Sequence, residues 1–166
     1  MMKYDPLLHI VLYEPDIPPN TGNVGRTCVA IGAKLWLVEP LGFSLDEQQV
    51  RRAGLDYWPH LELEVVPNWE TCLARLPARR PWFFSKHATK SYTEVTYEPG
   101  DILIFGSETS GLPSSVREEF HDRLLKIPMR PQVRSLNLAS SCAAIALEAV
   151  RQIDLAAGDP AWHASR

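Results

Sequence analysis

The sequence lacks the patterns that would mark a metal-binding, disulfide-bonded or membrane-spanning protein. Its three cysteines lie far apart without a C-x-x-C pair, and no two of its five histidines stand four residues apart. We therefore predict free thiols in a reducing cytoplasm, and no metal site. The apolar run from Leu7 to Tyr13 is interrupted by His9 and closed by Glu14. It is too short to span a bilayer, and it lacks the flanks of a secretory signal, so we expect no membrane association.

The sequence also has no excess of basic residues. With 17 lysines and arginines against 20 aspartates and glutamates, its formal net charge is −3. Taken alone, this charge argues weakly against nucleic acid as a partner. Distribution matters more than the sum, however, and many basic residues lie in or beside predicted loops: Arg51, Arg52, Arg79, Arg80, Lys86, Lys90, Lys126, Arg130 and Arg134. Solvated surface charge explains most of them individually, so charge does not decide the question.

No internal repeat, low-complexity tract or break in composition divides the 166 residues. A hydrophobic fraction of 45% and a charged fraction of 22% are ordinary for a soluble globular protein. The length suits one domain with a sizeable core. We predict a single domain over residues 1–153 and a loose tail over residues 154–166, where Gly158 and Pro160 accompany few apolar anchors.

Short apolar runs alternate with helical patterns along the chain. The predicted strands are Leu8–Tyr13, Lys34–Val38, Leu63–Val66, Trp82–Ser85, Ile102–Phe105 and Leu124–Ile127. The predicted helices are Gly22–Ile31, Ser44–Gly54, Asn68–Arg75, Pro113–Phe120 and Asn137–Ile153. This alternation predicts an α/β fold with a mainly parallel sheet flanked by helices. Ligands bind such sheets in the loops beyond the carboxyl ends of the strands.

The first polar loop, Asn20 to Thr27, follows the first predicted strand and enters a helix. Glycines there allow close approach of a ligand, and Arg26 offers donors suited to a phosphate. It is neither a Walker loop, because no Gly-Lys-Ser/Thr follows, nor a dinucleotide fingerprint, because the G-x-G pair is missing. When the loop is taken alone, a capped turn with a surface arginine is the better explanation.

Two further polar stretches follow later strands. Gly106 to Pro113 carries Glu108 between glycines, and its serines lack the glycine spacing of a serine hydrolase. This stretch fits a ligand-binding loop or an ordinary turn. In the stretch from Ile127 to Asn137, two prolines fix an irregular path, and Ser135 or Asn137 can cap the final helix.

In order, the three stretches read N-x-G-N-x-G-R, G-x-E-x-x-G-L-P and I-P-M-x-P-x-x-R-S-L-N. Together they resemble the three motifs of the SPOUT methyltransferases, and the resemblance spans essentially the whole chain. The segments Tyr13–Asn23 and Arg51–Tyr57 resemble in particular the small branch that methylates the wobble ribose of tRNA, at cytidine or uridine 34. Because the first predicted strand begins at Leu8, we expect none of the added RNA-binding extensions of related enzymes.

The resemblance implies a fold and a set of site residues. It implies a deep C-terminal trefoil knot that holds S-adenosylmethionine, largely through main-chain groups, at Phe84, Gly106, Ile127 and Ser135. Phe84 departs from the aliphatic residue common in the family. Around the reacting centre the resemblance places Asn20, Arg26, Glu108, Ser135 and Asn137.

The same resemblance implies a homodimer that acts on tRNA. The small residues Ala139, Ser140, Ala143, Ala144 and Ala146 would allow close helix packing in a dimer or within one chain. For tRNA contacts we expect Arg51, Arg52, Arg130 and Arg134, which flank the matched motifs. The donor's sulfonium already activates the methyl group, so the enzyme must align a ribose hydroxyl and remove its proton. A guanidinium is a poor base, so we predict that Arg26 clamps the oxygen and phosphate while Ser135, a phosphate oxygen or water takes the proton.

Three alternatives remain open at this stage. The same reaction could take place at another position of tRNA or ribosomal RNA. The chain could instead be a catalytically silent RNA-binding module on the same fold, or a nucleotide-binding α/β protein without RNA chemistry.

Overall fold

The computed structural model describes residues 6–45 and 56–158. A six-stranded sheet runs through it in the order β3-β2-β1-β5-β4-β6, and every neighbouring pair is parallel. The strands are β1 (His9–Tyr13), β2 (Lys34–Val38), β3 (Leu63–Val66), β4 (Pro81–Phe84), β5 (Ile102–Phe105) and β6 (Leu124–Leu125). The helices are α1 (Pro18–Ile31), α3 (Trp69–Arg75), α4 (Ser114–Glu119) and α5 (Leu138–Ala157), with short 3-10 helices η1 (Trp58–His60) and η2 (His121–Arg123). The predicted α/β class with a parallel sheet is confirmed.

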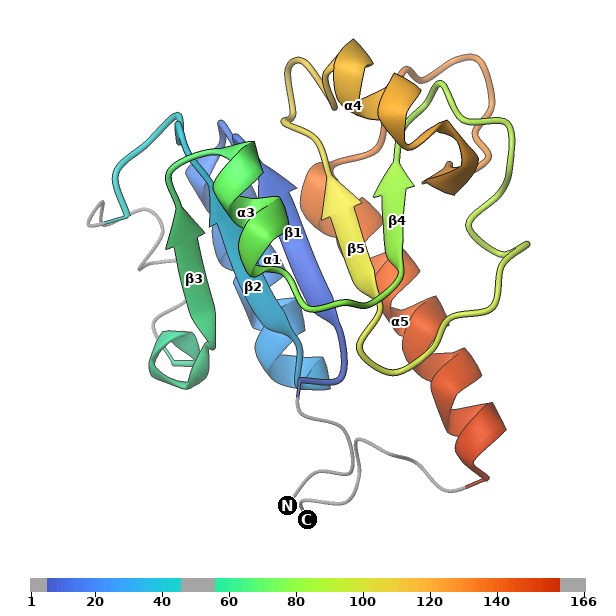
Figure 1. Ribbon diagram of the computed structural model, residues 1–166, viewed down its shortest axis with the longest axis horizontal. Helices are drawn as coiled ribbons and strands as arrows, with labels where there is room; N and C mark the ends of the chain where they lie inside the picture. The colour runs from blue at the N-terminus through green and yellow to red at the C-terminus, as the bar shows by residue number, and fades with distance from the viewer. Residues whose placement is uncertain (1–5, 46–55, 159–166) are drawn as a thin grey trace.

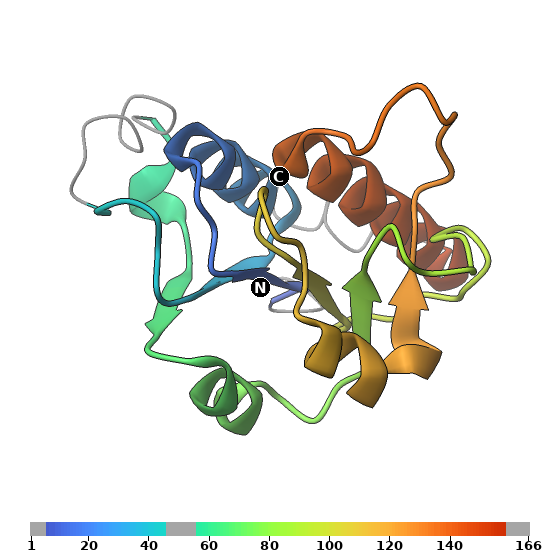
Figure 2. The same ribbon diagram turned by 90° about the horizontal axis from the view of Figure 1, so that it is seen from above.

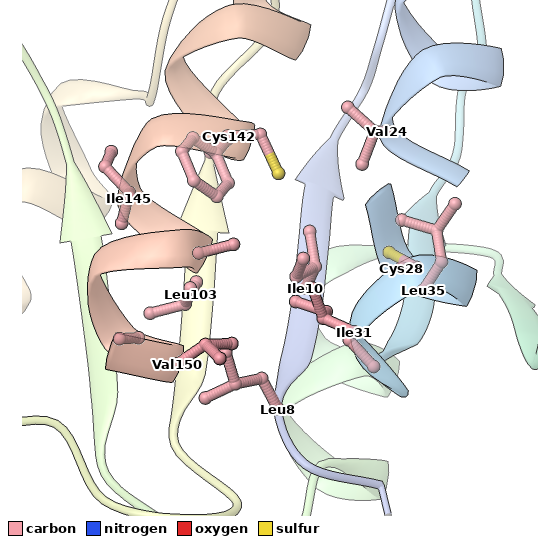
Figure 3. Close-up of a cluster of buried hydrophobic side chains, with 14 of the residues drawn as sticks. Leu8, Ile10, Val24, Cys28, Ile31, Leu35, Leu103, Cys142, Ile145 and Val150 are labelled. Carbon is pink, nitrogen blue, oxygen red and sulfur yellow. The ribbon is translucent and has the colours of Figure 1, made fainter. Parts of the chain in front are cut away.

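The helices form a layer on each face of the sheet (Figures 1 and 2): α1 and α5 cover one face, and α3 and α4 cover the other. Alternate side chains of β1 point to opposite faces of the sheet, since Ile10 and Leu12 belong to one buried cluster and Val11 to the other. On the α1/α5 side the sheet packs against two helices whose buried residues recur at helical spacing. Figure 3 shows this cluster, with Cys28 of α1 and Cys142 of α5 inside it.

All three cysteines are buried and free, as predicted. Burial raises the pKa of the Cys142 thiol to about 12, and it raises the pKa of Cys72 to the same range. At neutral pH these thiols are protonated and behave as small apolar side chains.

Several element boundaries differ from the sequence prediction. Helix α1 begins at Pro18, four residues before Gly22, so the stretch from Asn20 to Thr27 is helical and not a loop. Pro18 and Pro19 occupy the first helical positions, where a missing N–H costs nothing, and Gly32 ends the helix in the left-handed conformation. Strand β4 lies one residue earlier than predicted, and β6 is two residues shorter.

The final helix is longer than predicted. It begins after its cap at Asn137 and continues to Ala157, so residues 154–157, predicted as the start of a loose tail, are helical. Leu124–Leu125, Ile102–Phe105 and Trp69–Arg75 lie where strands and a helix were predicted. The predicted helix from Ser44 to Gly54 lies mostly outside the described residues.

Candidate active site

A pocket of about 560 Å³ opens at the carboxyl ends of β4 and β5. It extends to Asn20, after β1, and so reaches the boundary between β1 and β5, where the order of strands changes direction: β2 and β3 lie on one side, and β4, β5 and β6 on the other. Ligand sites of open α/β sheets lie at such a point. Most of the sequence-predicted site residues line this pocket: Asn20, Phe84, Gly106, Glu108, Ile127, Arg134, Ser135 and Asn137. The structure thus brings the three matched stretches together around one cavity.

Glu108 joins the loop after β5 to the start of α1. Its carboxylate accepts hydrogen bonds from the backbone N–H groups of Asp16 (2.8 Å) and Ile17 (3.2 Å) and from Asn20 Nδ2 (3.3 Å). Helix α1 has no side-chain cap of its own, so a carboxylate from 91 residues further along the chain serves its N-terminus. Thr109 adds a bond from its Oγ1 to Asp16 Oδ2 at 2.5 Å. In this structure Glu108 holds backbone in place.

Asn20 and Asn137 extend this network to α5. Asn137 Nδ2 donates to Asn20 Oδ1 at 2.9 Å, while Asn137 Oδ1 accepts from the N–H of Ser140 at 3.2 Å. The predicted capping role of Asn137 is therefore confirmed, and Ser135 is not the cap. Asn20 is only 7% exposed, and its side-chain amide is hydrogen bonded at both ends, to Glu108 and to Asn137. These two bonds fix its orientation. A continuous chain of bonds fixes the starts of α1 and α5 relative to the loop after β5.

Gly106 allows two backbone segments to touch. A Cβ at this position would lie 2.2 Å from the carbonyl carbon of Gly111 and 2.3 Å from the nitrogen of Leu112. No side chain fits at that distance. The loop closes there through the bond from Gly111 N–H to the Ser107 carbonyl, at 2.9 Å, and so forms one wall of the pocket.

The rest of the lining is apolar on one side and basic on another. The rings of Phe84 and Phe105 stack at 4.8 Å between centroids, and both line the pocket. Lys86, His87 and Lys126 also line it, although sequence reasoning did not select them for the site. Lys86 and His87 directly follow β4, so the rule that ligands bind beyond strand ends could have found them.

Arg26 does not line the pocket of its own chain. It is exposed, six residues beyond Asn20 on α1, which places it roughly 9 Å further along the helix axis and on another face. Its guanidinium lies over the ring of Tyr57, 5.1 Å from the centroid. Arg130 is also exposed and does not line the pocket, and Arg51 and Arg52 lie outside the described residues.

The comparisons with known proteins agree with this geometry. The model of the SpoU rRNA methylase family matches residues 7–147. The chain belongs to the SpoU methylase family. It is 44% identical over 151 residues to the tRNA (cytidine(34)-2'-O)-methyltransferase of Methylovorus glucosotrophus, covering 90% of this chain and 98% of that protein.

Solved structures of SpoU methylases share the fold. A structure solved to study the 2-OH methylation of C/U34 on tRNA superposes with a TM-score of 0.84 at 47% identity, covering 87% of this chain and 95% of the other. The SpoU methyltransferase AviRb from Streptomyces viridochromogenes, in complex with the cofactor AdoMet, gives a TM-score of 0.76 at 25% identity over 89% of this chain and 58% of its own.

Two absences complete the description of this SpoU methylase. Within residues 6–45 and 56–158, no group of three or more His, Cys, Asp or Glu side chains is arranged to hold a metal ion. Across those same residues, no helix has the length and apolar character needed to cross a membrane.

Proposed function

We propose that this protein transfers a methyl group from S-adenosylmethionine to the ribose 2′-hydroxyl of nucleotide 34, a cytidine or uridine, in tRNA. The observation that carries the proposal is the convergence of three sequence motifs on one pocket at the switch point of the sheet. The near full-length similarity to a tRNA (cytidine(34)-2'-O)-methyltransferase supports both the reaction and the target. A tRNA-modifying function implies a cytoplasmic location.

The pocket suits S-adenosylmethionine. Its lining combines apolar side chains, among them Phe84, Phe105 and Ile127, with hydroxyl, amide and charged groups, and such a mixture fits a charged nucleoside. Phe84, Gly106, Ile127 and Ser135 would hold the donor. The sulfonium of the bound donor supplies an activated methyl group, so the protein needs to provide alignment and a route for one proton. Alignment of two reactants is worth roughly 7–11 kcal/mol.

The network around Glu108 serves this alignment. Glu108 fixes the start of α1, and Asn20 and Asn137 then fix the start of α5, so the two asparagines face the pocket with defined orientation. Ser135 lies exposed at the same pocket, and its Oγ makes no hydrogen bond within the described residues. As the ribose oxygen bonds to the methyl carbon and the carbon–sulfur bond breaks, the hydroxyl proton would leave through Ser135 Oγ, a phosphate oxygen or water.

Arg26 acts in this proposal as an electrostatic clamp on the ribose oxygen and its phosphate. Because it lies outside the pocket of its own chain, it reaches a reacting centre only if a second chain brings it there. We therefore propose a homodimer in which α1 of one protomer approaches the pocket of its partner. Large apolar side chains are exposed nearby: Ile17 at 42% and Leu136 at 45% line the pocket, and Leu147 on α5 is 53% exposed.

We propose further that the C-terminal part of the chain forms the trefoil knot. The segment between β4 and β5 lies against α5, since Gln152 Oε1 accepts from Tyr97 N–H (2.9 Å) and Gln152 Nε2 donates to the Val95 carbonyl (3.2 Å). The chain after β6 lies beside the same segment, through bonds of Lys126 with Lys90 and Tyr92. Helix α5, which follows, packs on α1. This arrangement supports threading of α5 through the loop.

Methylation of defined transcripts tests the function. The purified protein and labelled S-adenosylmethionine should methylate leucine-type tRNA transcripts, and mass spectrometry should place the methyl group on nucleotide 34. A matched transcript with 2′-deoxyribose at that nucleotide alone should accept none. Undiminished incorporation into the deoxy transcript would move the target to another position, and no incorporation into any RNA would favour a silent RNA-binding module.

Binding of the donor is tested separately. Calorimetry with S-adenosylmethionine and its demethylated product should give the same affinity with and without EDTA. Loss of binding on chelation would contradict the metal-free site.

The RNA contacts have a test of their own. Alanine at Arg134, which lines the pocket, or at Arg130, Arg51 or Arg52 should lower tRNA affinity and flatten its salt dependence by about one unit of slope for each lost phosphate contact. Donor affinity should not change. A variant whose salt dependence equals that of the wild type makes no phosphate contact at that position.

A further inference from the structure

Tyr57 packs on the face of α1 that carries Arg26. Its hydroxyl donates to the carbonyl of Gly22, and a Cβ at Gly25 would lie 3.6 Å from its ring. Gly25 and Arg26 follow Gly22 by three and four residues, so all three lie on one side of the helix. The ring thus packs close to the backbone of the helix, and Arg26 covers it with the guanidinium 5.1 Å from the ring centroid.

Arg26 has no carboxylate partner among the described residues. A carboxylate would fix the guanidinium but would also cancel its charge and occupy its donors. An aromatic face attracts the same group through its quadrupole without cancelling its charge. Burial raises the pKa of Tyr57, against an opposing effect of Arg26, so the phenol is neutral at physiological pH and the ring presents no counter-charge.

We propose that Tyr57 is the positioning residue of Arg26, holding its guanidinium in one place with its charge available to RNA. Tyr57 lies between β2 and β3, outside the three motifs that line the pocket. The inference rests on the proposed function only for the task of Arg26, the binding of an RNA phosphate and ribose. It adds a fourth segment, 57–61, to the parts of the chain that determine turnover.

Kinetics of tRNA methylation test the proposal. Tyr57→Leu keeps an apolar side chain and removes the ring face, so kcat should fall about tenfold, since misplacement of a positioned group by about 1 Å can cost about 100-fold. The KM for S-adenosylmethionine should not change. Tyr57→Phe restores the ring without the bond to Gly22 and should recover most of the lost turnover. Trp58→Leu removes another ring from the same segment that is not paired with Arg26, and it serves as the packing control.

A double-mutant cycle separates positioning from simple packing. In an Arg26→Ala background, Tyr57→Leu should cause no further loss of kcat, because no guanidinium remains to be positioned. A tenfold loss in both backgrounds would overturn the proposal, as would full activity of a folded Tyr57→Leu protein. If the leucine variant does not fold, Tyr57→Met gives the same comparison.

A spectroscopic readout keeps this proposal distinct from the proposed function. In the wild type the ring of Tyr57 should shift the NMR resonance of the Arg26 Nε–H group upfield, and Tyr57→Phe should preserve that shift. Tyr57→Leu should abolish it. If tRNA 34 is not methylated but the shift behaves in this way, the function fails and the positioning stands. Identical Arg26 resonances in wild type and Tyr57→Leu would refute the positioning whatever the enzyme methylates.

Discussion

The two ends of the sheet use carboxylates in different ways. At the amino end, Asp101 is 2% exposed and accepts from the Arg80 guanidinium, from Trp82 Nε1 and from the N–H of Glu98. At the carboxyl end, Glu108 accepts from two backbone N–H groups and from Asn20, beside an open pocket. Both carboxylates join segments that are distant in sequence. Only the second leaves its neighbours facing a cavity.

This difference separates stability from function. The Asp101 network is closed, because a charged partner and an indole complete it, and its loss should affect folding alone. The Glu108 network holds the starts of two helices around the space that a substrate would fill, so its loss should affect turnover more than folding. The predictions below test that division.

The largest effect is expected at Gly106. Gly106→Ala places a Cβ 2.2 Å from the backbone of Gly111, so the loop must move and the pocket wall with it. We expect the free energy of unfolding to fall by about 3 kcal/mol or more, and S-adenosylmethionine binding by calorimetry to be lost. Gly111→Ala is the matched control, since its left-handed backbone costs about 1–2 kcal/mol but nothing lies within 4 Å of the new Cβ. Equal losses in both variants would argue against close contact as the cause.

The second largest effect is expected at Asp101, at the amino ends of the strands. Asp101→Ala removes the acceptor of three donors, and we expect chemical denaturation to show a loss of about 3 kcal/mol. Turnover per folded molecule should stay at the wild-type value. Glu98→Ala removes the other carboxylate near Arg80, at 3.6 Å and 63% exposed, and should cost less than about 1 kcal/mol. A loss of turnover in folded Asp101→Ala protein would break the proposed division between the two ends.

The sequence predicted part of this arrangement and missed the contacts made by tertiary packing. The alternation of strands and helices, the parallel sheet and the clustering of three motifs at one edge followed from local patterns and the rule for ligand sites. The start of α1 was missed although Pro18-Pro19 signalled it, because the glycines after Asn20 indicated a loop. The bonds of Glu108 to α1 and the contact of Tyr57 with Arg26 were beyond reach, since they join residues 31 to 92 positions apart through tertiary packing.

The third effect is expected at Glu108, beside the pocket at the carboxyl ends of the strands. Glu108→Gln keeps the size of the side chain but removes the charge at the start of α1 and one of its acceptor oxygens. We expect unfolding to become easier by about 1 kcal/mol, whereas tRNA methylation should fall about tenfold or more because Asn20 loses its orientation. Donor affinity by calorimetry should change little. A variant that loses stability but keeps its turnover would give Glu108 the same purely structural role as Asp101.

The smallest effect is expected at His9, at the amino end of β1. This side chain is 8% exposed, and its Nδ1 accepts a hydrogen bond from Trp36 Nε1 at 3.1 Å, which requires a neutral ring. Burial lowers the pKa of His9 to about 4, assisted by the charges of Lys34 and Arg79. An unfolded histidine titrates near 6.5, so the unfolded chain takes up a proton that the folded protein refuses between these values. Stability from this group is therefore complete above about pH 6.5 and declines as the pH falls toward 4.

Between pH 7.5 and pH 5.5 the loss due to His9 should be about 1 kcal/mol. The measurement is the free energy of unfolding across this range for the wild type and for His9→Gln, whose amide oxygen can still accept from Trp36 but cannot titrate. The other histidines are common to both proteins, so only the difference between the two curves reports on His9. Parallel curves would mean that the amino end admits a charged imidazole. The amino ends of the strands would then not exclude charge, and the contrast with the open pocket would fail.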